Sequence, residues 1–258
     1  MDELTENTEA TEPVVCELSE EQYNEFFRVI SILKDSCDDI DIVDGVIRQR
    51  STDNSSIFEV NLQGYFDGVN LPLSQLKRKI DLLKMFVGNE VKITVSGDDC
   101  IFADEYSSLS FKKIQRSYLD NTFMSEEDLN SIFDLRDDTL MLSTEIPTRI
   151  SERINAIKQG FNITALQINF EQENANMTAI TQSKDQSAKL MSDLLTEISV
   201  DGSTDLVIAP FIIDHDGDMS FKIYHIQDGV LVNKVDTTIG NLDIVVYGKS
   251  RLVVNETE

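Results

Sequence analysis

One β-rich pattern occurs twice along this chain, and this repetition constrains the fold more than any single motif. In the first half a helix opens at Ser19, with Gln22 placed to complete a capping box. Alternating apolar segments, a second helix and further alternating segments follow. Asp44-Gly45 between two of these segments is a strong hairpin signal. The expected strands of this half are 39–43, 46–50, 57–62, 90–95, 100–103 and 109–114.

The second half returns to this order after a connector over 117–137, in which Ser125 can start a helical turn. A strand at 139–143 precedes a helix that opens at Pro147 and ends at Gly160. A counterpart of the second helix is short or missing near Ile212–Met219. The later expected strands are 166–170, 177–181, 206–213, 220–226, 229–235 and 242–247. Residues 186–199 fit either a strand or a helix.

These patterns predict an α+β chain with two repeated β-rich domains. The expected divisions are an acidic disordered tail over 1–17, a first domain over 18–116, the connector over 117–137 and a second domain over 138–258.

The second helix of the first half, expected over 72–86, carries an unusual charge distribution. Pro72 suits a first helical position and Gly88 suits a helix stop. One face is apolar, and the other is mostly cationic. The apolar face is formed by Leu73, Leu76, Ile80, Leu83 and Val87. The cationic face is formed by Lys77, Arg78 and Lys84, with Asp81 among them.

The chain as a whole is strongly acidic, with 22 Lys and Arg against 47 Asp and Glu and a formal net charge of −25. A cationic helix face on such a chain indicates charge segregation, with one surface kept for a polyanion. A solvated amphipathic helix with a chance excess of lysines is the alternative. The overall acidity argues against a protein that coats nucleic acid with its whole surface, but it permits a local basic patch or a mimic of DNA.

No membrane, secretory or cofactor signal stands out in the sequence. The chain has no apolar run of the length that a membrane span needs, and its N-terminus has no signal-peptide pattern. We therefore expect a cytoplasmic protein that does not enter a membrane. Cys16, Cys37 and Cys100 are odd in number and far apart, so neither a disulfide framework nor a zinc site is expected.

Three stretches resemble the DNA sliding clamps, most closely those of tailed bacteriophages, and are similar to proliferating cell nuclear antigen. They are D-G-V-I-R-Q-R-S-T-D-N-S-S-I-F-E-V-N-L, then N-L-P-L-S-Q-L-K-R-K-I-D-L-L-K-M-F with N-E-V-K-I-T-V, and finally S-T-E-I-P-T-R-I-S-E-R-I-N-A-I running into T-A-L-Q-I-N-F. The resemblance covers roughly residues 18–254. It implies a DNA-clamp fold, with antiparallel sheets outside and helices lining the inner face of a ring around duplex DNA. It also favours a strand over 188–198.

The resemblance implies a DNA polymerase processivity factor that encircles double-stranded DNA without sequence preference. The expected assembly is a homotrimer, placed on DNA by an ATP-driven clamp loader, that tethers the replicative polymerase. The residues that match the inward helices by position are Lys77, Arg78, Lys84, Arg149 and Arg153. The first helix departs from this pattern because it shows more acid than base. Edge pairing between subunits is expected at 109–114 and 188–194.

Partner proteins of the clamp family bind a hydrophobic pocket near the connector. Phe123, Met124, Ile132 and Phe133 are the apolar residues of this connector that suit such a groove. Packing of the connector onto its own domains is the alternative explanation for the same residues.

The sequence shows no catalytic motif, and we expect neither an enzyme nor a bound cofactor. The segment 214–218 (D-H-D-G-D) invites a calcium site, but Met219 and His225 stand where an EF-hand loop needs Gly and Glu. A plain turn is therefore expected there. Two other functions are compatible with the composition: an acidic DNA mimic that inhibits a nucleic-acid enzyme, and a β-rich structural or virion protein.

Overall fold

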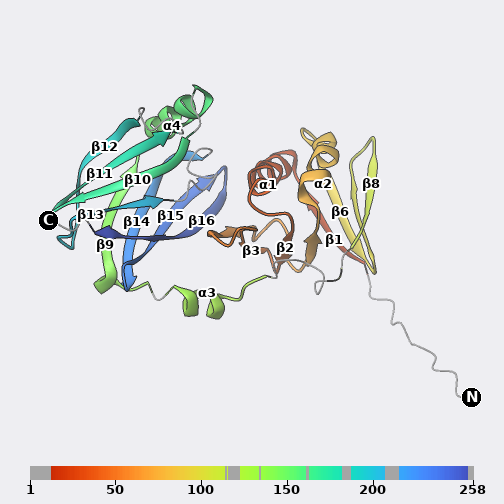
Figure 1. The fold of residues 1–258 in the computed structure, drawn as a ribbon. Coiled ribbons are helices and arrows are strands. Elements are labelled where there is room, and N and C mark those ends of the chain that lie inside the picture. The colour runs from red at the N-terminus through yellow and green to blue at the C-terminus, as the bar shows by residue number, and fades with distance from the viewer. Residues whose placement is uncertain are drawn as a thin grey trace, which may run out of the picture.

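The computed structural model describes residues 13–113, 115, 123–133, 135–160, 163–181, 187–206 and 215–254. Within these residues the chain forms three antiparallel sheets and four α-helices, as an α+β fold requires (Figure 1).

The first half contains a four-stranded sheet, in the order β1-β6-β7-β8, covered by two helices. Its strands are β1 (Val14–Leu18), β6 (Val91–Ser96), β7 (Asp99–Ala103) and β8 (Ser108–Lys112). Its helices are α1 (Glu20–Leu33) and α2 (Leu76–Leu83), the latter continued by the 3-10 turn η1 (Lys84–Phe86). Tyr23 of α1 and Phe102 of β7 both pack on Phe86, with ring centroids 6.2 and 6.4 Å away. All three rings are fully buried, and burying one such side chain stabilises a fold by about 2–3 kcal/mol.

An eight-stranded sheet joins the two halves of the chain. Its order is β5-β2-β3-β4-β16-β15-β14-β9. The strands from the first half are β2 (Ile40–Val43), β3 (Val46–Arg50), β4 (Ser56–Asn61) and β5 (Leu71–Leu73). Those from the second half are β9 (Leu140–Ile146), β14 (Asp216–Gln227), β15 (Val230–Ile239) and β16 (Leu242–Arg251). Because β4 pairs with β16 from Ser56 opposite Gly248 to Val60 opposite Ile244, the halves share a backbone hydrogen-bond ladder.

The second half adds a five-stranded sheet, in the order β12-β11-β10-β13-β17. Its strands are β10 (Ile163–Glu171), β11 (Asn174–Thr181), β12 (Ser187–Leu195), β13 (Gly202–Leu206) and β17 (Val253–Val254). The helices of this part of the chain are α3 (Glu126–Ile132), in the connector, and α4 (Thr148–Gly160).

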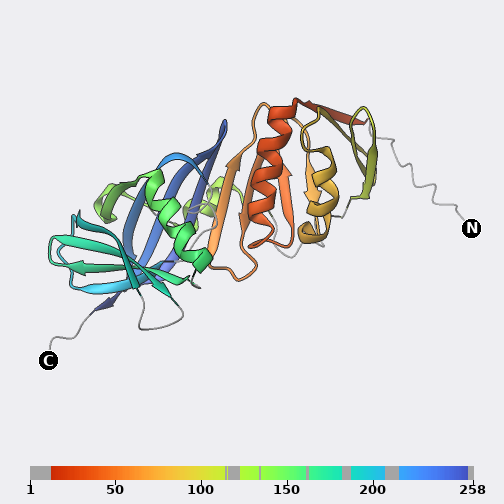
Figure 2. The same cartoon turned by 90° about the horizontal axis from the view of Figure 1, so that it is seen from above.

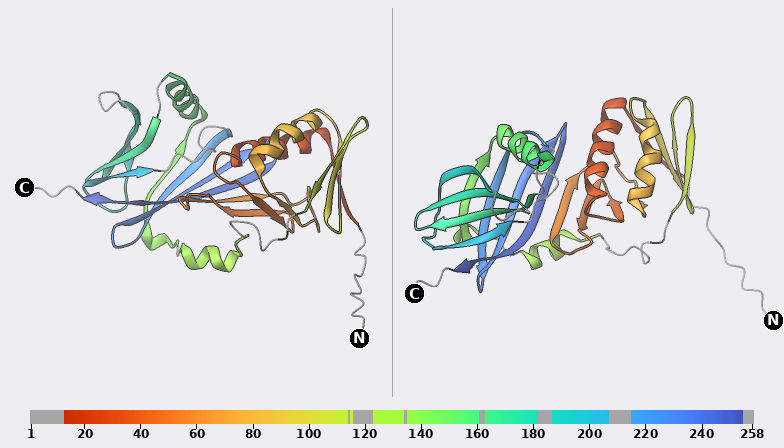
Figure 3. Two further views of the ribbon diagram at one scale, coloured as in Figure 1. Left: turned by 45° about the vertical axis from the view of Figure 1, so that its right-hand side comes forward. Right: turned by 45° about the horizontal axis from the view of Figure 1, so that its top comes forward.

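The helices are divided between two faces of the molecule. α1, α2 and α4 lie along one face, and α3 lies on the opposite face (Figures 1 and 3). When the molecule is viewed from above, α4 from the second half and α1 and α2 from the first all lie toward the viewer (Figure 2). We call this side the helix face.

Several local predictions are confirmed. The Ser19 hydroxyl accepts from the Gln22 backbone N–H at 3.2 Å, and the Gln22 side chain accepts from the Ser19 N–H at 3.0 Å, as in a capping box. Asp44 and Gly45 have φ of 49° and 74°, the left-handed pair that a tight hairpin turn needs. Residues 187–195 of the ambiguous segment form strand β12.

The prediction that the basic helix begins at Pro72 is wrong. Pro72 lies in strand β5, opposite Asp41 of β2, and α2 begins only at Leu76. Gln75 has a left-handed φ of 53°, which separates the strand from the helix. β5 is an edge strand, where the missing N–H of a proline is tolerated. Leu73 is buried as expected, but in the strand.

Two other boundaries also differ from expectation. The acidic tail was expected to reach residue 17, but Val14–Leu18 pair with β6 as strand β1, while residues 1–12 lie outside the described part. β14 begins at Asp216 instead of 220, so part of the expected 214–218 turn is strand. The expected strand 206–213 lies largely outside the described residues. The region of the missing second helix is described from residue 215 on, and residues 216–219 there belong to strand β14.

The start of β14 connects α1 to α4 across the two halves. The Arg28 guanidinium of α1 donates to both carboxylate oxygens of Asp216, at 2.9 and 2.7 Å, and the Gly240 N–H donates to the same carboxylate at 2.7 Å. Asp218 accepts from the Thr148 N–H at the first turn of α4, at 3.0 Å. The buried Ser151 hydroxyl hydrogen-bonds His215. The segment therefore serves as a polar junction below the helix face.

We predict that Asp216→Asn lowers the free energy of unfolding at pH 7 by about 1 kcal/mol, because it weakens a partly exposed charged junction. Desolvation raises the pKa of Asp216, but hydrogen bonds from Arg28 and Gly240 outweigh this, and the pKa lies below its ordinary value. The stabilisation is therefore present above the unfolded-state pKa and is lost as pH falls through the lower folded-state value. Urea unfolding of both proteins between pH 7 and pH 3 measures this difference.

The matched control is Glu17→Gln, which removes the exposed ion pair with Lys92 inside one sheet. This change is expected to cost less than about 0.5 kcal/mol. An Asp216→Asn effect no larger than the control would contradict the junction.

Candidate functional site

Exposed cations from both halves lie on the helices of the helix face. Lys77, Arg78 and Lys84 are exposed on α2 and η1, because Leu76, Ile80 and Leu83 occupy the buried side. Arg149 and Arg153 are exposed on α4, where Ile150 and Ile154 are buried. The structure thus places all five predicted residues on exposed helix surface.

Most of these cations have no acidic partner among the described residues. Lys77 lies 3.9 Å from a carboxylate oxygen of Asp38, and both side chains are more than half exposed. The other four make no ion pair in the described part of the chain. A long, exposed contact such as Lys77–Asp38 is weak, so all five charges remain available to an anion.

Helix α1 contributes differently to this face. Its first turn carries Glu20 and Glu21, and Arg28 is its one cation. Because Arg28 is held by Asp216, α1 presents more acid than base, as the sequence predicts. The positive charge of the helix face therefore belongs to α2 and α4.

Sequence reasoning missed exposed apolar side chains on the same helix. Leu82 and Met85 are each 49% exposed, and Val87, which was expected on the buried face, is 42% exposed. The adjacent pairs Leu82-Leu83 and Met85-Phe86 carry the signal, because only one member of each can point into the core.

The four predicted connector residues pack on the outer side of the eight-stranded sheet. Met124 and Phe133 are 8% and 5% exposed, while Phe123 and Ile132 are partly buried. Phe133 stacks on Tyr247 of β16, with ring centroids 5.3 Å apart. Ser125 is the N-cap of α3: its side chain accepts from the Asp128 N–H, and the Asp128 carboxylate accepts from the Ser125 N–H. This confirms the prediction that Ser125 starts a helical turn. The structure thus shows the connector packed on its own sheet, and a partner role for these residues stays a prediction.

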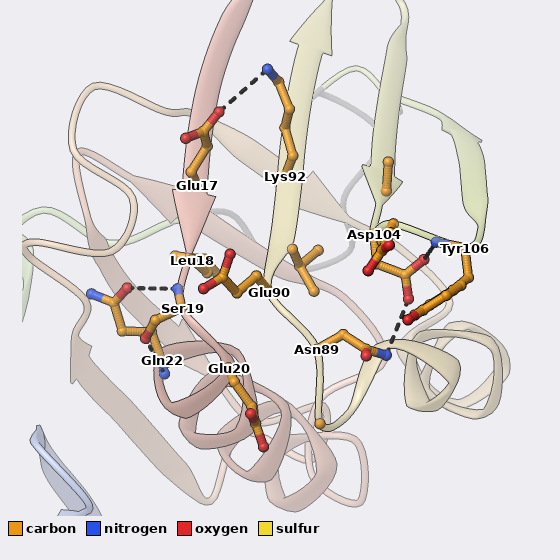
Figure 4. Close-up of a pocket in the computed structure, with 14 residues that line it drawn as sticks. Glu17, Leu18, Ser19, Glu20, Gln22, Asn89, Glu90, Lys92, Asp104 and Tyr106 are labelled. Carbon is orange, nitrogen blue, oxygen red and sulfur yellow. Dashed lines mark hydrogen bonds and ion pairs between the residues drawn. The ribbon is translucent and has the colours of Figure 1, made fainter.

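A separate acidic cleft of about 800 Å³ opens where β1 meets α1, next to the β7–β8 turn (Figure 4). Its charged lining residues are Glu17, Glu20, Glu90, Asp104, Glu105 and Lys92. Lys92 is paired with Glu17 at 3.3 Å, so the cleft is strongly negative. Desolvation raises the pKa of Asp104, but hydrogen bonds from Ser107 and Tyr106 outweigh this and hold the pKa below its usual range. A polyanion is repelled here.

The described residues contain neither a metal-binding cluster nor a cysteine thiol with a lowered pKa. They hold no cluster of three or more His, Cys, Asp or Glu side chains that could bind a metal. Burial raises the pKa of Cys16 to about 11 and of Cys37 and Cys100 to about 12, so these thiols are protonated at neutral pH. The Ser151–His215 pair is buried and joins α4 to β14.

None of the described helices has the length and apolar character needed to cross a membrane.

Comparison with solved structures identifies the fold. The chain is similar to the PCNA2–PCNA3 complex from Sulfolobus tokodaii, with TM-score 0.64 and 12% identity over 92% of this chain and 99% of that one. It is also similar to A. fulgidus PCNA bound to the C-terminal region of FEN-1, with TM-score 0.61 and 12% identity over 95% and 99% of the two chains. The Helicobacter pylori beta clamp bound to a DNA ligase peptide matches with TM-score 0.58 and 11% identity, over 95% of this chain and 68% of that one.

No family model matches the sequence, and no curated protein matches it either. The likeness is therefore one of structure: the chain has the DNA-clamp fold of antiparallel sheets and helices, as predicted.

We predict that Phe133→Ala loosens the connector without unfolding the two halves. The change removes the stacking on Tyr247 and most of a buried side chain, and we expect the free energy of unfolding to fall by about 2–3 kcal/mol. Limited proteolysis should cut between 117 and 137 faster than in the unaltered protein. Ile132→Ala, at the adjacent and less buried last residue of α3, is the control and should change both readings less. Equal cleavage rates for all three proteins would contradict the packing role.

Proposed function

We propose that this protein is a DNA sliding clamp, a processivity factor that encircles duplex DNA and tethers a replicative polymerase. The observation that carries the proposal is the clamp fold with exposed cations from both halves on one helix face, in a chain of net charge −25. The resemblance to clamps of tailed bacteriophages makes a phage replication system, in the host cytoplasm, the specific expectation.

The charge pattern suits a protein that must hold DNA and still slide. Lys and Arg contacts to phosphates are independent of sequence and weaken with salt, so a few of them orient a duplex without fixing its register. Lys77, Arg78 and Lys84 on one helix and Arg149 and Arg153 on another supply such contacts. Acidic surface elsewhere, including the cleft lined by Glu17 and Glu90, repels DNA and leaves α2 and α4 as the favourable contacts.

Two exposed sheet edges provide a way to close a ring. β8 is an edge strand of the four-stranded sheet, and β12 is an edge strand of the five-stranded sheet. The two strands lie at opposite ends of the molecule (Figure 1). Pairing of β8 on one copy with β12 on the next would remove both edges and generate a closed cyclic assembly. Three copies form the proposed ring, which an ATP-driven clamp loader places on DNA.

The partner surface is proposed to lie beside the connector. The similar clamps from A. fulgidus and Helicobacter pylori were solved with a FEN-1 region and a DNA ligase peptide bound. Phe123 and Ile132 are partly exposed next to the buried Met124 and Phe133, so they offer apolar contact to a short polymerase peptide.

We predict that Arg149→Glu with Arg153→Glu weakens binding to duplex DNA and shortens polymerase runs, while the fold stays intact. Loss of two phosphate contacts should reduce the slope of log affinity against log salt by about 2. Salt titrations with a linear duplex and primer-extension lengths measure the effect. The paired change Lys77→Glu with Arg78→Glu should act in the same direction.

The matched control reverses Lys222 and Lys234, which are opposite each other on β14 and β15 and lie outside the helices. This pair carries the same change in net charge and should leave the salt slope unchanged. Equal effects of both paired changes would show that overall charge, and not the helix face, governs DNA binding.

We also predict a mass near three times the 29.1 kDa chain mass in solution, because the β8 and β12 edges pair between copies. Light scattering behind a sizing column, over a wide concentration range, measures it. Retention on circular DNA with loss from linear DNA ends would then show encirclement. A strict monomer at high concentration would contradict the ring.

A further inference from the structure

The exposed part of α2 and η1 combines positive charge with apolar surface, and we call it the cationic-apolar face. It consists of Lys77, Arg78, Leu82, Lys84 and Met85, with the exposed Asp81 among the cations, and of Val87 directly after η1. Phosphate groups can pair with the cations, but they make no favourable apolar contact with the half-exposed Leu82 and Met85. An exposed apolar patch rimmed by charge is typical of a site that binds protein. A complementary ligand is a peptide with several carboxylates and a few apolar side chains.

The chain itself contains such a segment. Residues 1–12 carry five carboxylates, at Asp2, Glu3, Glu6, Glu9 and Glu12, and no Lys or Arg. Met1 and Leu4 supply apolar side chains. We propose that residues 1–12 bind the cationic-apolar face when DNA is absent and compete with DNA for it. The proposal rests on the proposed function only where it concerns DNA.

The position of β1 makes this contact reachable. Val14, the first residue of β1, lies in one cross-strand row with Val95, Cys100 and Phe111 of the four-stranded sheet. Lys79 of α2 sits over the Phe111 ring, 5.1 Å from its centroid. Three strand spacings separate Val14 from Phe111, or about 15 Å. Twelve residues span up to about 40 Å when extended, which is enough to cross the sheet and the width of a helix.

Residues 1–12 suit the cationic-apolar face better than the acidic residues of the cleft do. The acidic residues of the cleft near Glu17 and Glu90 belong to β1, to α1 and to the ends of β6 and β7, so they are fixed in the fold and cannot move to α2. The attraction between five carboxylates and Lys77, Arg78 and Lys84 falls with salt, whereas contacts to Leu82 and Met85 do not. Binding of the segment would therefore be strongest at low salt, where sequence-independent DNA binding is also strongest.

The direct test uses methionine methyl NMR on the protein without DNA. Met85 is half-exposed, whereas Met141, Met177 and Met219 are fully buried and serve as internal references. Deleting residues 2–12 should shift the Met85 methyl signal at low salt and leave the buried methyls in place. A peptide of residues 1–12, added to the deletion variant, should reverse the shift. An unchanged Met85 signal on deletion would overturn the proposal.

Matched substitutions separate local binding from overall charge. The tail set changes Glu3, Glu6, Glu9 and Glu12 to Gln. The control set changes four exposed glutamates of α3 and the β10–β11 turn region to Gln, namely Glu126, Glu127, Glu171 and Glu173. The tail set should reproduce the deletion, and the control set should leave Met85 unchanged. A Met85 shift of equal size from the control set would also overturn the proposal.

The DNA measurement distinguishes this proposal from the proposed function. If the segment covers the face about 80–90% of the time, its deletion should tighten binding of a short linear duplex about five- to tenfold at low salt. Unchanged affinity together with a Met85 shift would support the bound segment and contradict α2 as a DNA surface. A rise in affinity without a Met85 shift would overturn the bound segment.

Discussion

The pairing of β4 with β16 is the interaction on which the arrangement of this molecule depends. Five residue pairs, from Ser56–Gly248 to Val60–Ile244, make the two halves parts of one sheet. Gly248, at one end of this ladder, leaves room for the buried Asn233 on β15, because a Cβ there would lie 2.6 Å from the Asn233 side-chain oxygen. A flexible connector would let the halves rotate, whereas a shared ladder holds their helices on the same face.

The polar junction at the start of β14 adds a second connection between the two halves. Arg28 of α1 is anchored by Asp216, and Thr148 of α4 by Asp218, only two residues away. The relative positions of α1 and α4 are therefore set by one short segment. The same ion pair removes the single cation of α1 from the helix face, so the structure of the junction also shapes the charge of the surface.

Local chemistry made much of the fold predictable. The Ser19 and Ser125 caps, the Asp44-Gly45 turn and most strands follow from hydrogen-bonding side chains, left-handed turn residues and apolar alternation, all of which act within a few residues. The likeness to clamps correctly favoured a strand for β12. The predictions that were wrong depended on residues distant in the sequence. Pro72 lies in a strand because it pairs with β2, and Val14–Leu18 form a strand because they pair with β6.

The candidate site shows the same division. Exposure of Lys77, Arg78, Lys84, Arg149 and Arg153 follows from helix periodicity alone, because apolar residues on the opposite side fix the orientation. The burial of Met124 and Phe133 cannot be predicted from periodicity, because it depends on Tyr247 of β16, which lies beneath the connector. Their DNA-facing and partner-binding roles stay predictions.

The distribution of cations over the helix face matters more than their number. Three belong to the first half and two to the second, and the carboxylates of α1 belong to the same face. In the proposed clamp, a duplex against such a face would meet attraction at two helices and repulsion at another, so no single register would be strongly preferred. The shared β4–β16 ladder keeps that spacing constant. Weak, separated contacts held at a fixed spacing restrain a polyanion laterally and still allow it to move along its axis, which is the physical requirement of sliding.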